Sequence, residues 1–242
     1  MKSAHRRLDT QAEQEKKGLP MSNQLEKDKT EFIEFLIKQN VLKFGEFTLK
    51  SGRQSPYFFN LGSVASGAAF AALGRAYART IVQSGIEFDL LFGPAYKGIP
   101  IAVATSLALA EHGIDAGVAY NRKEAKAHGE GGQLVGAPVQ GRVLMLDDVL
   151  TSGKAIRDAA ALINVADANI VGVVIAMDRA EATNPDNAAA RETAVSSLSN
   201  ELGASVISIA HVTDVLAYLA DDAAAGESFA AMSAYVTQHC VR

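Results

Sequence analysis

The sequence predicts an α/β protein with a parallel sheet flanked by helices, and three observations lead to this fold class. Short apolar runs such as Val143–Leu146 alternate with longer segments of helical spacing, the pattern of buried parallel strands joined by helices. The chain has 242 residues, of which 48% are hydrophobic, enough to bury one sizeable core. Charged and glycine-rich motifs follow the apolar runs, and open α/β sheets bind ligands beyond the carboxyl ends of their strands.

The chain begins with a polar segment that has little to bury. Residues 1–20 end in Gly18-Leu-Pro20, and we expect them to form a disordered extension before a single domain over residues 21–242. The spacing of the apolar side chains within Phe32–Leu36 predicts an amphipathic helix that ends near Asn40.

The remaining elements are predicted from the spacing of apolar residues and from the turn-forming residues between them. Two strands over 47–50 and 57–60 are expected to form a hairpin-like pair around the turn 51–56, before a small-residue helix over 66–84. Strands are then predicted over 89–92, 117–121, 142–146, 170–177 and 205–209. Helices are predicted from the turn 93–98 to about 112, over 154–164 and 188–202, and at the C-terminus, with a glycine-rich polar stretch up to 132.

Composition excludes several classes of function. The net charge of −4 argues against general attraction to nucleic acid, and the single cysteine, Cys240, excludes a cysteine-rich metal site and an internal disulfide. No apolar run approaches the roughly 20 residues of a membrane helix. The first residues resemble neither a secretory signal nor an acid-poor transit peptide, so we expect a cytoplasmic enzyme. Neither a P-loop nor a Rossmann fingerprint is present.

The most informative segment is the end of the apolar run that leads into two adjacent acids. Asp147 and Asp148 are followed by the small turn residues Thr151–Gly153 and by a helix from about Lys154. This order places backbone N–H groups and hydroxyls at a helix N-terminus, a ready anion site. Two carboxylates beside an anion site suit a ligand that also offers hydroxyl donors, such as a ribose 5-phosphate. The alternative is a buried strand that ends in a solvated acidic turn.

Two further loops carry positive charge. The turn Gly93–Gly98 combines glycines, which permit close backbone approach, with Lys97, which suits a diphosphate. It could equally be an ordinary turn with a solvated lysine. The segment Asn121–Gly132 concentrates basic residues before three glycines. A basic run with glycine hinges suits a lid that closes over an anion, although most charge runs are solvated faces.

These motifs together resemble the type I phosphoribosyltransferases and, within them, the orotate phosphoribosyltransferases of bacteria. The motifs are Lys50, SGRQSPYFFN at 51–60, GPAYKG at 93–98, RKEAKAHGEGG at 122–132 and LDDVLTSG at 146–153. The resemblance covers roughly Glu31 to Leu219. It implies the type I phosphoribosyltransferase fold, with a small hood from about 31–62. It also implies transfer of the 5-phosphoribosyl group of 5-phosphoribosyl 1-diphosphate (PRPP) to orotate, giving orotidine 5′-monophosphate and diphosphate.

The resemblance also implies a set of site residues. PRPP is expected to bind Lys50, Tyr96, Lys97, Arg122, Lys123, Lys126, His128, Asp147, Asp148, Val149, Leu150, Thr151, Ser152, Gly153, Lys154 and Ala155. Asp147 and Asp148 would hold the ribose hydroxyls, and 151–155 the 5-phosphate. Catalysis is assigned to Arg122, Lys123, Lys126 and His128 of the lid, together with Asp148. Orotate is expected to meet Lys50, Phe58, Phe59, Thr151 and the guanidinium of Arg179.

The family further implies a cofactor, a partner and one backbone feature. Mg²⁺ is expected without a dedicated protein cage, carried by the substrate, with Asp147 as a contact through water. A homodimer with shared active sites is implied, because the family's lid reaches into the partner's site. The peptide bond between Ala95 and Tyr96 would be cis.

Two departures from the commoner motifs leave the residues assigned to chemistry intact. Ser152 and Lys154 stand where Ala and Thr are more usual, so Lys154 either adds a charge near the phosphate or points to solvent. Ala127 replaces a frequent aspartate. Two alternatives remain, a non-catalytic PRPP-binding regulatory module and a phosphoribosyltransferase for another base. The first would need a nucleic-acid-binding element, and none is visible; a purine enzyme would not explain SGRQSPYFFN or Arg179.

Overall fold

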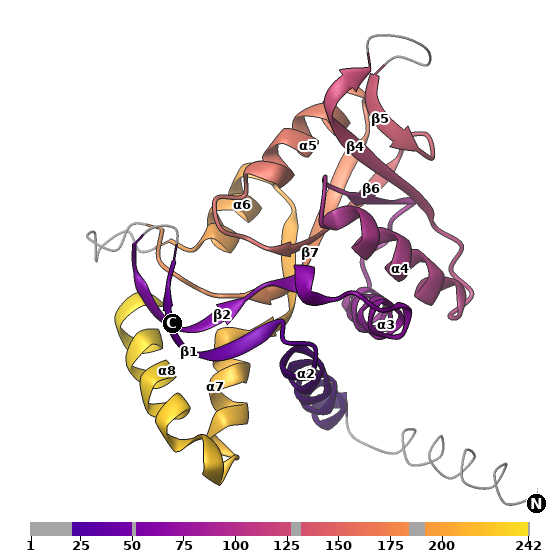
Figure 1. Ribbon diagram of the computed structural model, residues 1–242. Helices are drawn as coiled ribbons and strands as arrows, with labels where there is room; N and C mark the ends of the chain where they lie inside the picture. The colour runs from indigo at the N-terminus through magenta and orange to yellow at the C-terminus, as the bar shows by residue number, and fades with distance from the viewer. Residues whose placement is uncertain (1–20, 50–51, 127–131, 184–191, 242) are drawn as a thin grey trace, which may run out of the picture.

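The computed structural model describes residues 21–49, 52–126, 132–183 and 192–241. Its centre is a six-stranded sheet with the order β5-β4-β3-β6-β7-β8 (Figure 1). The strands are β3 (Leu90–Gly93), β4 (Gly117–Lys126), β5 (Gly132–Gly136), β6 (Arg142–Val149), β7 (Asn169–Asp178) and β8 (Ser205–His211). All neighbouring pairs are parallel except β4 and β5. The predicted fold class is therefore confirmed. The expected extension over 1–20 lies outside the described residues.

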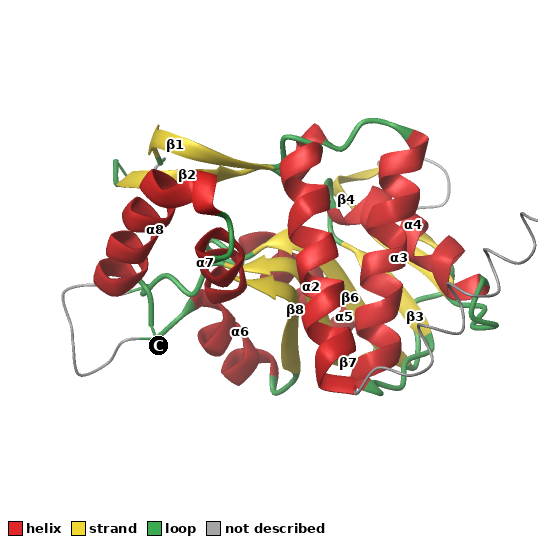
Figure 2. Ribbon diagram, turned by 90° about the horizontal axis from the view of Figure 1, so that it is seen from below, coloured by secondary structure: helices red, strands yellow, loops and turns green. Residues whose placement is uncertain are grey.

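Helices cover both faces of this sheet because its strands are apolar on both sides. Along β6, Leu144 and Leu146 belong to the core shared with the N-terminal and C-terminal helices, whereas Val143 and Met145 belong to a second core. The first face carries α2 (Met21–Lys38), α3 (Gly67–Ser84), α4 (Gly98–Ala110) and α7 (Val212–Ala220) (Figure 2). The second face carries α5 (Lys154–Val165) and α6 (Ala194–Leu202).

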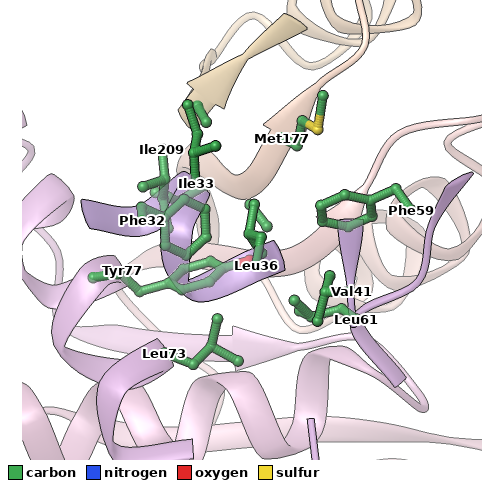
Figure 3. Packing of buried hydrophobic residues seen from close by; sticks show 14 of the residues in the cluster. Phe32, Ile33, Leu36, Val41, Phe59, Leu61, Leu73, Tyr77, Met177 and Ile209 are labelled. Carbon is green, nitrogen blue, oxygen red and sulfur yellow. The ribbon is translucent and has the colours of Figure 1, made fainter. Parts of the chain in front are cut away.

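The first core joins segments that are far apart in the chain. Phe32, Ile33 and Leu36 of α2 lie beside Tyr77 of α3 and Ile209 of β8 (Figure 3). All five side chains are less than 9% exposed, so this core fixes α2 and α3 against the sheet. The predicted amphipathic helix is confirmed, and it begins earlier than the apolar spacing indicated, at Met21.

The antiparallel strands β1 (Leu42–Thr48) and β2 (Gln54–Phe59) form the expected hairpin outside the main sheet. This hairpin packs against α8 (Gly226–His239), as both views show (Figures 1 and 2). Short 3-10 turns at Leu61–Ser63 and Ala223–Ala225 complete the described chain. Across these described residues, no helix is both long and apolar enough to cross a membrane.

Three predicted elements differ from the structure. The polar stretch after 121 is partly a strand, because β4 continues to Lys126 and pairs with the unpredicted β5. An edge hairpin needs no long apolar run, so periodicity did not reveal it. The strand predicted over 142–146 continues to Val149. The helix predicted from 188 begins at Ala194 in the described chain, where Thr193 caps its N-terminus in a reciprocal capping box.

Candidate functional site

The two adjacent acids lie within β6, near its carboxyl end, and both residues are only 7% exposed. We expected the strand to end before them so that both side chains could reach one ligand. The structure shows instead that β6 continues through them, so successive side chains leave opposite faces. Asp148 shares the face of Leu146, toward α4, and Asp147 shares the face of Met145, toward α5.

Asp148 is paired with the lysine of the glycine-rich turn. Lys97 Nζ lies 2.5 Å from Asp148 Oδ2, and Lys97 is the residue immediately before α4. The structure thus joins two residues that the sequence assigned to different parts of one ligand. Because the carboxylate is buried and the ammonium is half exposed, the pair extends from the buried strand to the surface and leaves its positive partner accessible to an anion.

The glycines of the turn permit close approach to the chain's own backbone. A Cβ on Gly98 would lie 2.6 Å from the carbonyl oxygen of Leu146, and one on Gly93 would lie 2.2 Å from that of Gly98. These glycines therefore allow α4 to begin directly against β3 and β6. The Ala95–Tyr96 peptide bond is cis, as expected, and the Ala95 N–H donates to Asn121 Oδ1 at 3.0 Å.

Asp147 is held in a less polar environment than its neighbour. Its Oδ1 accepts the backbone N–H of Asp148 at 2.9 Å, and its carbonyl oxygen accepts the hydroxyl of buried Tyr77 at 2.7 Å. Burial, followed by the nearby charge of Asp148, raises the pKa of Asp147 from 3.8 to about 7. The carboxyl is therefore ready to receive a cation or a hydroxyl donor, either of which favours its ionised form.

This raised pKa predicts a pH dependence of stability. Between pH 3.8 and about 7 the folded protein keeps a proton on Asp147 that the unfolded chain has lost. The unfolding free energy contributed by this group is therefore fully present below pH 3.8 and is lost as the pH rises toward 7. Urea unfolding across this range should show a less negative slope of stability against pH for Asp147→Asn than for the wild type. Equal slopes would contradict the assignment.

The turn after β6 forms an open helix N-terminus. Gly153 precedes α5 with a left-handed φ of 65° and offers no side-chain cap. The Lys154 N–H donates to the Ser152 hydroxyl at 3.4 Å, so an anion at the first N–H groups of α5 would compete with this long bond. Leu150 is buried beneath the turn, whereas Thr151 and Ser152 are exposed. Lys154 Nζ lies 2.9 Å from Asp158 Oδ2, so its ammonium pairs along the helix.

The basic segment lies on the strand next to the glycine-rich turn. Arg122 and Lys123 are part of β4, and Lys123 Nζ stands 4.6 Å from the centroid of the Tyr96 ring, a cation–π contact. This contact brings the predicted lid and diphosphate turn together. The backbone of Lys126 pairs with Gly132, whereas its side chain is not described and His128 lies outside the described residues.

Arg179 directly follows β7 and is held on two sides. Its Nε donates to the Tyr57 hydroxyl at 3.0 Å, its guanidinium carbon lies 5.0 Å from the Tyr57 ring centroid, and its Nη2 lies 2.5 Å from Glu181 Oε1. The Arg179 side chain is 13% exposed. Glu181 also accepts the Tyr235 hydroxyl at 2.8 Å and pairs with Arg53 at 3.3 Å.

This arginine cluster was only partly predicted. It comprises Arg53, Tyr57, Arg179, Glu181 and Tyr235. Two guanidinium groups face one carboxylate, so one positive charge remains for an anionic ligand. Sequence reasoning missed Glu181 and Tyr235, although a carboxylate two residues after a functional arginine is a signal worth testing.

The remaining predicted residues lie on the hairpin. Phe58 is exposed and stacks on Phe47 at 5.5 Å between ring centroids, whereas Phe59 is nearly buried. Lys50 lies outside the described residues.

Among the described residues, no group of three or more His, Cys, Asp or Glu side chains could hold a metal ion. The two carboxylates of β6 nonetheless suit Mg²⁺ that arrives with most of its ligands from substrate and water.

Comparisons with known proteins show the family of this chain. Residues 60–215 match the model of the phosphoribosyl transferase domain. The chain is 56% identical over 200 residues to the orotate phosphoribosyltransferase of Chromohalobacter salexigens, covering 82% of this chain and 86% of that protein. It is 51% identical over 212 residues to that of Cronobacter sakazakii, covering 87% and 97% of the two chains.

Solved structures lead to the same family. The crystal structure of orotate phosphoribosyltransferase from Francisella tularensis superposes with a TM-score of 0.75 and 37% sequence identity. The match covers 87% of this chain and 99% of that one. The similarity therefore extends over most of this chain and nearly all of that one.

Proposed function

The chain belongs to the orotate phosphoribosyltransferases of the type I phosphoribosyltransferase family, and we propose that it transfers the phosphoribosyl group with the site at the carboxyl ends of β3, β6 and β7. The observation that carries this assignment is the meeting of the Lys97–Asp148 pair with the open N-terminus of α5. A ribose carrying a diphosphate at one end and a phosphate at the other has matching groups in both places. Because the relatives are orotate enzymes, the regulatory module and the enzyme for another base are not retained.

Asp147 and Asp148 would accept hydrogen bonds from the two ribose hydroxyls of PRPP. Lys97 neutralises Asp148 at 2.5 Å, and its ammonium would contact the diphosphate of a PRPP whose ribose hydroxyls bind the two acids. The acids, together with Val149 and Leu150, thus fix the sugar. The residues Thr151–Ala155 would hold the 5-phosphate through backbone N–H groups and hydroxyls.

Catalysis would depend on charge that develops as diphosphate leaves. The bond from the ribose C1 to the diphosphate breaks ahead of attack by orotate, which leaves an oxocarbenium-like sugar and a growing negative charge. Cations placed near the leaving group stabilise this transition state more than the ground state. Lys97 and Tyr96 on the turn, and Arg122, Lys123, Lys126 and His128 of the lid, are proposed for this role.

Orotate would be recognised by its carboxylate and by the hairpin. The excess positive charge of the arginine cluster suits the carboxylate, which Arg179 would bind with the edge that Tyr57 and Glu181 leave open. The backbone around Phe58 and Phe59, with Lys50 and Thr151, would border the ring.

We propose Mg²⁺ as the cofactor, bound through PRPP and water, with Asp147 as an outer contact. When bound, the ion supplies positive charge to the diphosphate and ribose oxygens. The test of the function as a whole is orotate consumption with PRPP in the presence and absence of Mg²⁺. Turnover with orotate that stops when the metal is chelated is expected. Equal turnover with orotate and with adenine would overturn the base assignment.

A homodimer is proposed, and the exposed side of α4 is its most apolar candidate surface. The helix contains no charged residue, and it leaves Val103 and Leu107 exposed, the latter at 69%. Exposed large apolar side chains that gather on one helix face are typical of an interface. Since α4 begins directly after Lys97, an interface here would place a second subunit beside the site.

Leu107→Asp should therefore shift the protein from dimer to monomer and lower activity, because the carboxylate would be buried without a partner. Sedimentation at several protein concentrations measures the shift. Val165→Asp is the matched control, because Val165 is 87% exposed at the end of α5 and away from this face. Equal association by both variants would exclude the α4 face.

Shared active sites can be tested by mixing two inactive variants. Lys126→Ala removes a proposed lid residue and Asp148→Asn a sugar contact. If each lid serves the partner's site, hybrid dimers hold one intact site, and mixing should restore about one quarter of the wild-type activity after random exchange. No recovery despite demonstrated subunit exchange would show that each lid serves its own site.

A further inference from the structure

The first turn of α5 contains an arginine whose side chain reaches back over the phosphate loop, defined here as residues 151–155. Arg157 Nη1 donates to the carbonyl oxygen of Ser152, and Arg157 Nε donates to Glu201 Oε2 on α6 at 2.6 Å. The backbone N–H of Arg157 donates to the carbonyl of Gly153 at 3.0 Å. One residue therefore contacts two consecutive peptide groups of the loop and also a second helix.

The contact to Ser152 fixes the direction of the next N–H. In a trans peptide the carbonyl and the N–H point to opposite sides of the chain. With the Ser152 carbonyl held toward Arg157, the N–H of Gly153 points away from Arg157 and toward the open side of the loop. We propose that Arg157, held in place by Glu201, is a positioning residue that aims the N–H groups of the phosphate loop at the 5-phosphate.

Gly153 supports the same inference. Its φ of 65° lies in the left-handed region, and a Cβ at this position would come within 2.9 Å of Arg157 Nη1. A side chain here would therefore strain the backbone and also displace the guanidinium from the loop. The glycine is needed both for the turn and for the close approach of the arginine.

The role is geometric more than electrostatic. Glu201 compensates the charge of Arg157 at 2.6 Å, so the pair adds little net field at the anion site. A guanidinium that donates to a carbonyl also polarises that peptide group and strengthens its N–H as a donor. The inference rests on the proposed location of the 5-phosphate, and its test must separate the two.

The discriminating measurement compares substrates with and without a 5-phosphate. Arg157→Ala should raise the KM of PRPP, and of orotidine 5′-monophosphate in the reverse reaction, by about tenfold, the size of one charge-assisted hydrogen bond. The KM values of orotate and diphosphate should stay within about twofold. Diphosphate is not assigned to the phosphate loop, and orotate is assigned only Thr151 of it, whereas Arg157 contacts the carbonyls of Ser152 and Gly153. Inhibition by ribose 5-phosphate should weaken by the same factor as PRPP binding.

Graded variants keep the test informative if Arg157→Ala folds poorly. Arg157→Lys retains the charge but cannot hold Ser152 and Glu201 together, so it should recover only part of the loss. Glu201→Gln leaves the arginine in place with a weaker partner. It should raise the KM values of PRPP and orotidine 5′-monophosphate by a smaller factor. Equal increases in all four KM values would reduce Arg157 to a structural residue and overturn the proposal.

Gly153→Ala, which disturbs the loop directly, separates this proposal from the site assignment. If Gly153→Ala raises the KM values of PRPP and orotidine 5′-monophosphate while Arg157→Ala does not, the loop binds the phosphate but the positioning role of Arg157 is wrong. If neither Gly153→Ala nor Arg157→Ala changes these KM values, the 5-phosphate binds elsewhere and both assignments are wrong. Arg142→Ala is the matched control, since it removes a paired surface arginine from the opposite end of β6.

Discussion

Asp148→Asn should lower kcat/KM for PRPP by about ten- to a hundredfold while the fold is retained. Asparagine keeps an acceptor oxygen but loses the negative charge, so the ion pair of Lys97 at 2.5 Å disappears and a ribose hydroxyl meets a weaker acceptor. Each unpaired group in a buried site costs about 1–3 kcal/mol. Steady-state kinetics with PRPP varied at saturating orotate give the constant.

Lys97→Met distinguishes the role of Lys97 from that of Asp148. If Lys97 serves the diphosphate, this variant should also reduce turnover, because the leaving group loses a cation. Unchanged PRPP kinetics in Asp148→Asn, with thermal unfolding also unchanged, would show that this acid does not bind the sugar. If either Asp148→Asn or Lys97→Met unfolds, the Lys97–Asp148 pair is needed for stability.

Arg179→Ala should narrow the preference for orotate over uracil by roughly one to two orders of magnitude. Uracil lacks the carboxylate, so in the wild type it leaves a largely buried guanidinium without its anion, and a charge-assisted hydrogen bond contributes about 1.5–3 kcal/mol. Removal of Arg179 eliminates that difference. The quantity to measure is the ratio of kcat/KM for the two bases, with PRPP kinetics nearly unchanged.

Arg53→Ala is the graded variant for this experiment. Arg53 pairs with the same carboxylate, Glu181, at 3.3 Å, so its loss removes the excess positive charge of the cluster without removing Arg179. The orotate-to-uracil preference should then narrow by less than in Arg179→Ala, because the guanidinium that binds the carboxylate remains. Arg179→Lys should recover only part of the preference, since an ammonium cannot form the two parallel bonds of a guanidinium. If Arg179→Ala keeps the wild-type ratio of kcat/KM for orotate and uracil, another group binds the orotate carboxylate, and Lys50 is the next candidate.

The sequence predicted those features that depend on local pattern. The apolar run 143–146 and the glycine at 153 are local signals, so the buried strand and the turn before α5 were found. The two acids were found, but their placement within β6 was not, because buried acids within a strand depend on Lys97 and on the N-terminus of α4. Those contacts join residues about 50 positions apart, which periodicity does not report.

Long-range pairing explains the other omissions. Strand β5 owes its existence to its partner β4 rather than to its own composition. Glu181 and Tyr235 are joined across 54 positions, and each is unremarkable alone. Gly93 and Gly98 were predicted to permit close backbone approach, and the described contacts are with the chain's own backbone. They admit a helix against the sheet, a demand that only the packed structure reveals.

The last described residues stabilise the segment that follows Arg179. Ala182 N–H donates to the carbonyl of His239, and Val241 N–H donates to that of Ala180. The backbone after Arg179 is thus held by residues about 60 positions later in the chain, whereas every residue proposed for PRPP precedes 156. A chain clipped before His239 would lose both bonds, so we expect the choice of base to suffer more than the binding of the sugar. An affinity tag is therefore better placed away from residues 239–241.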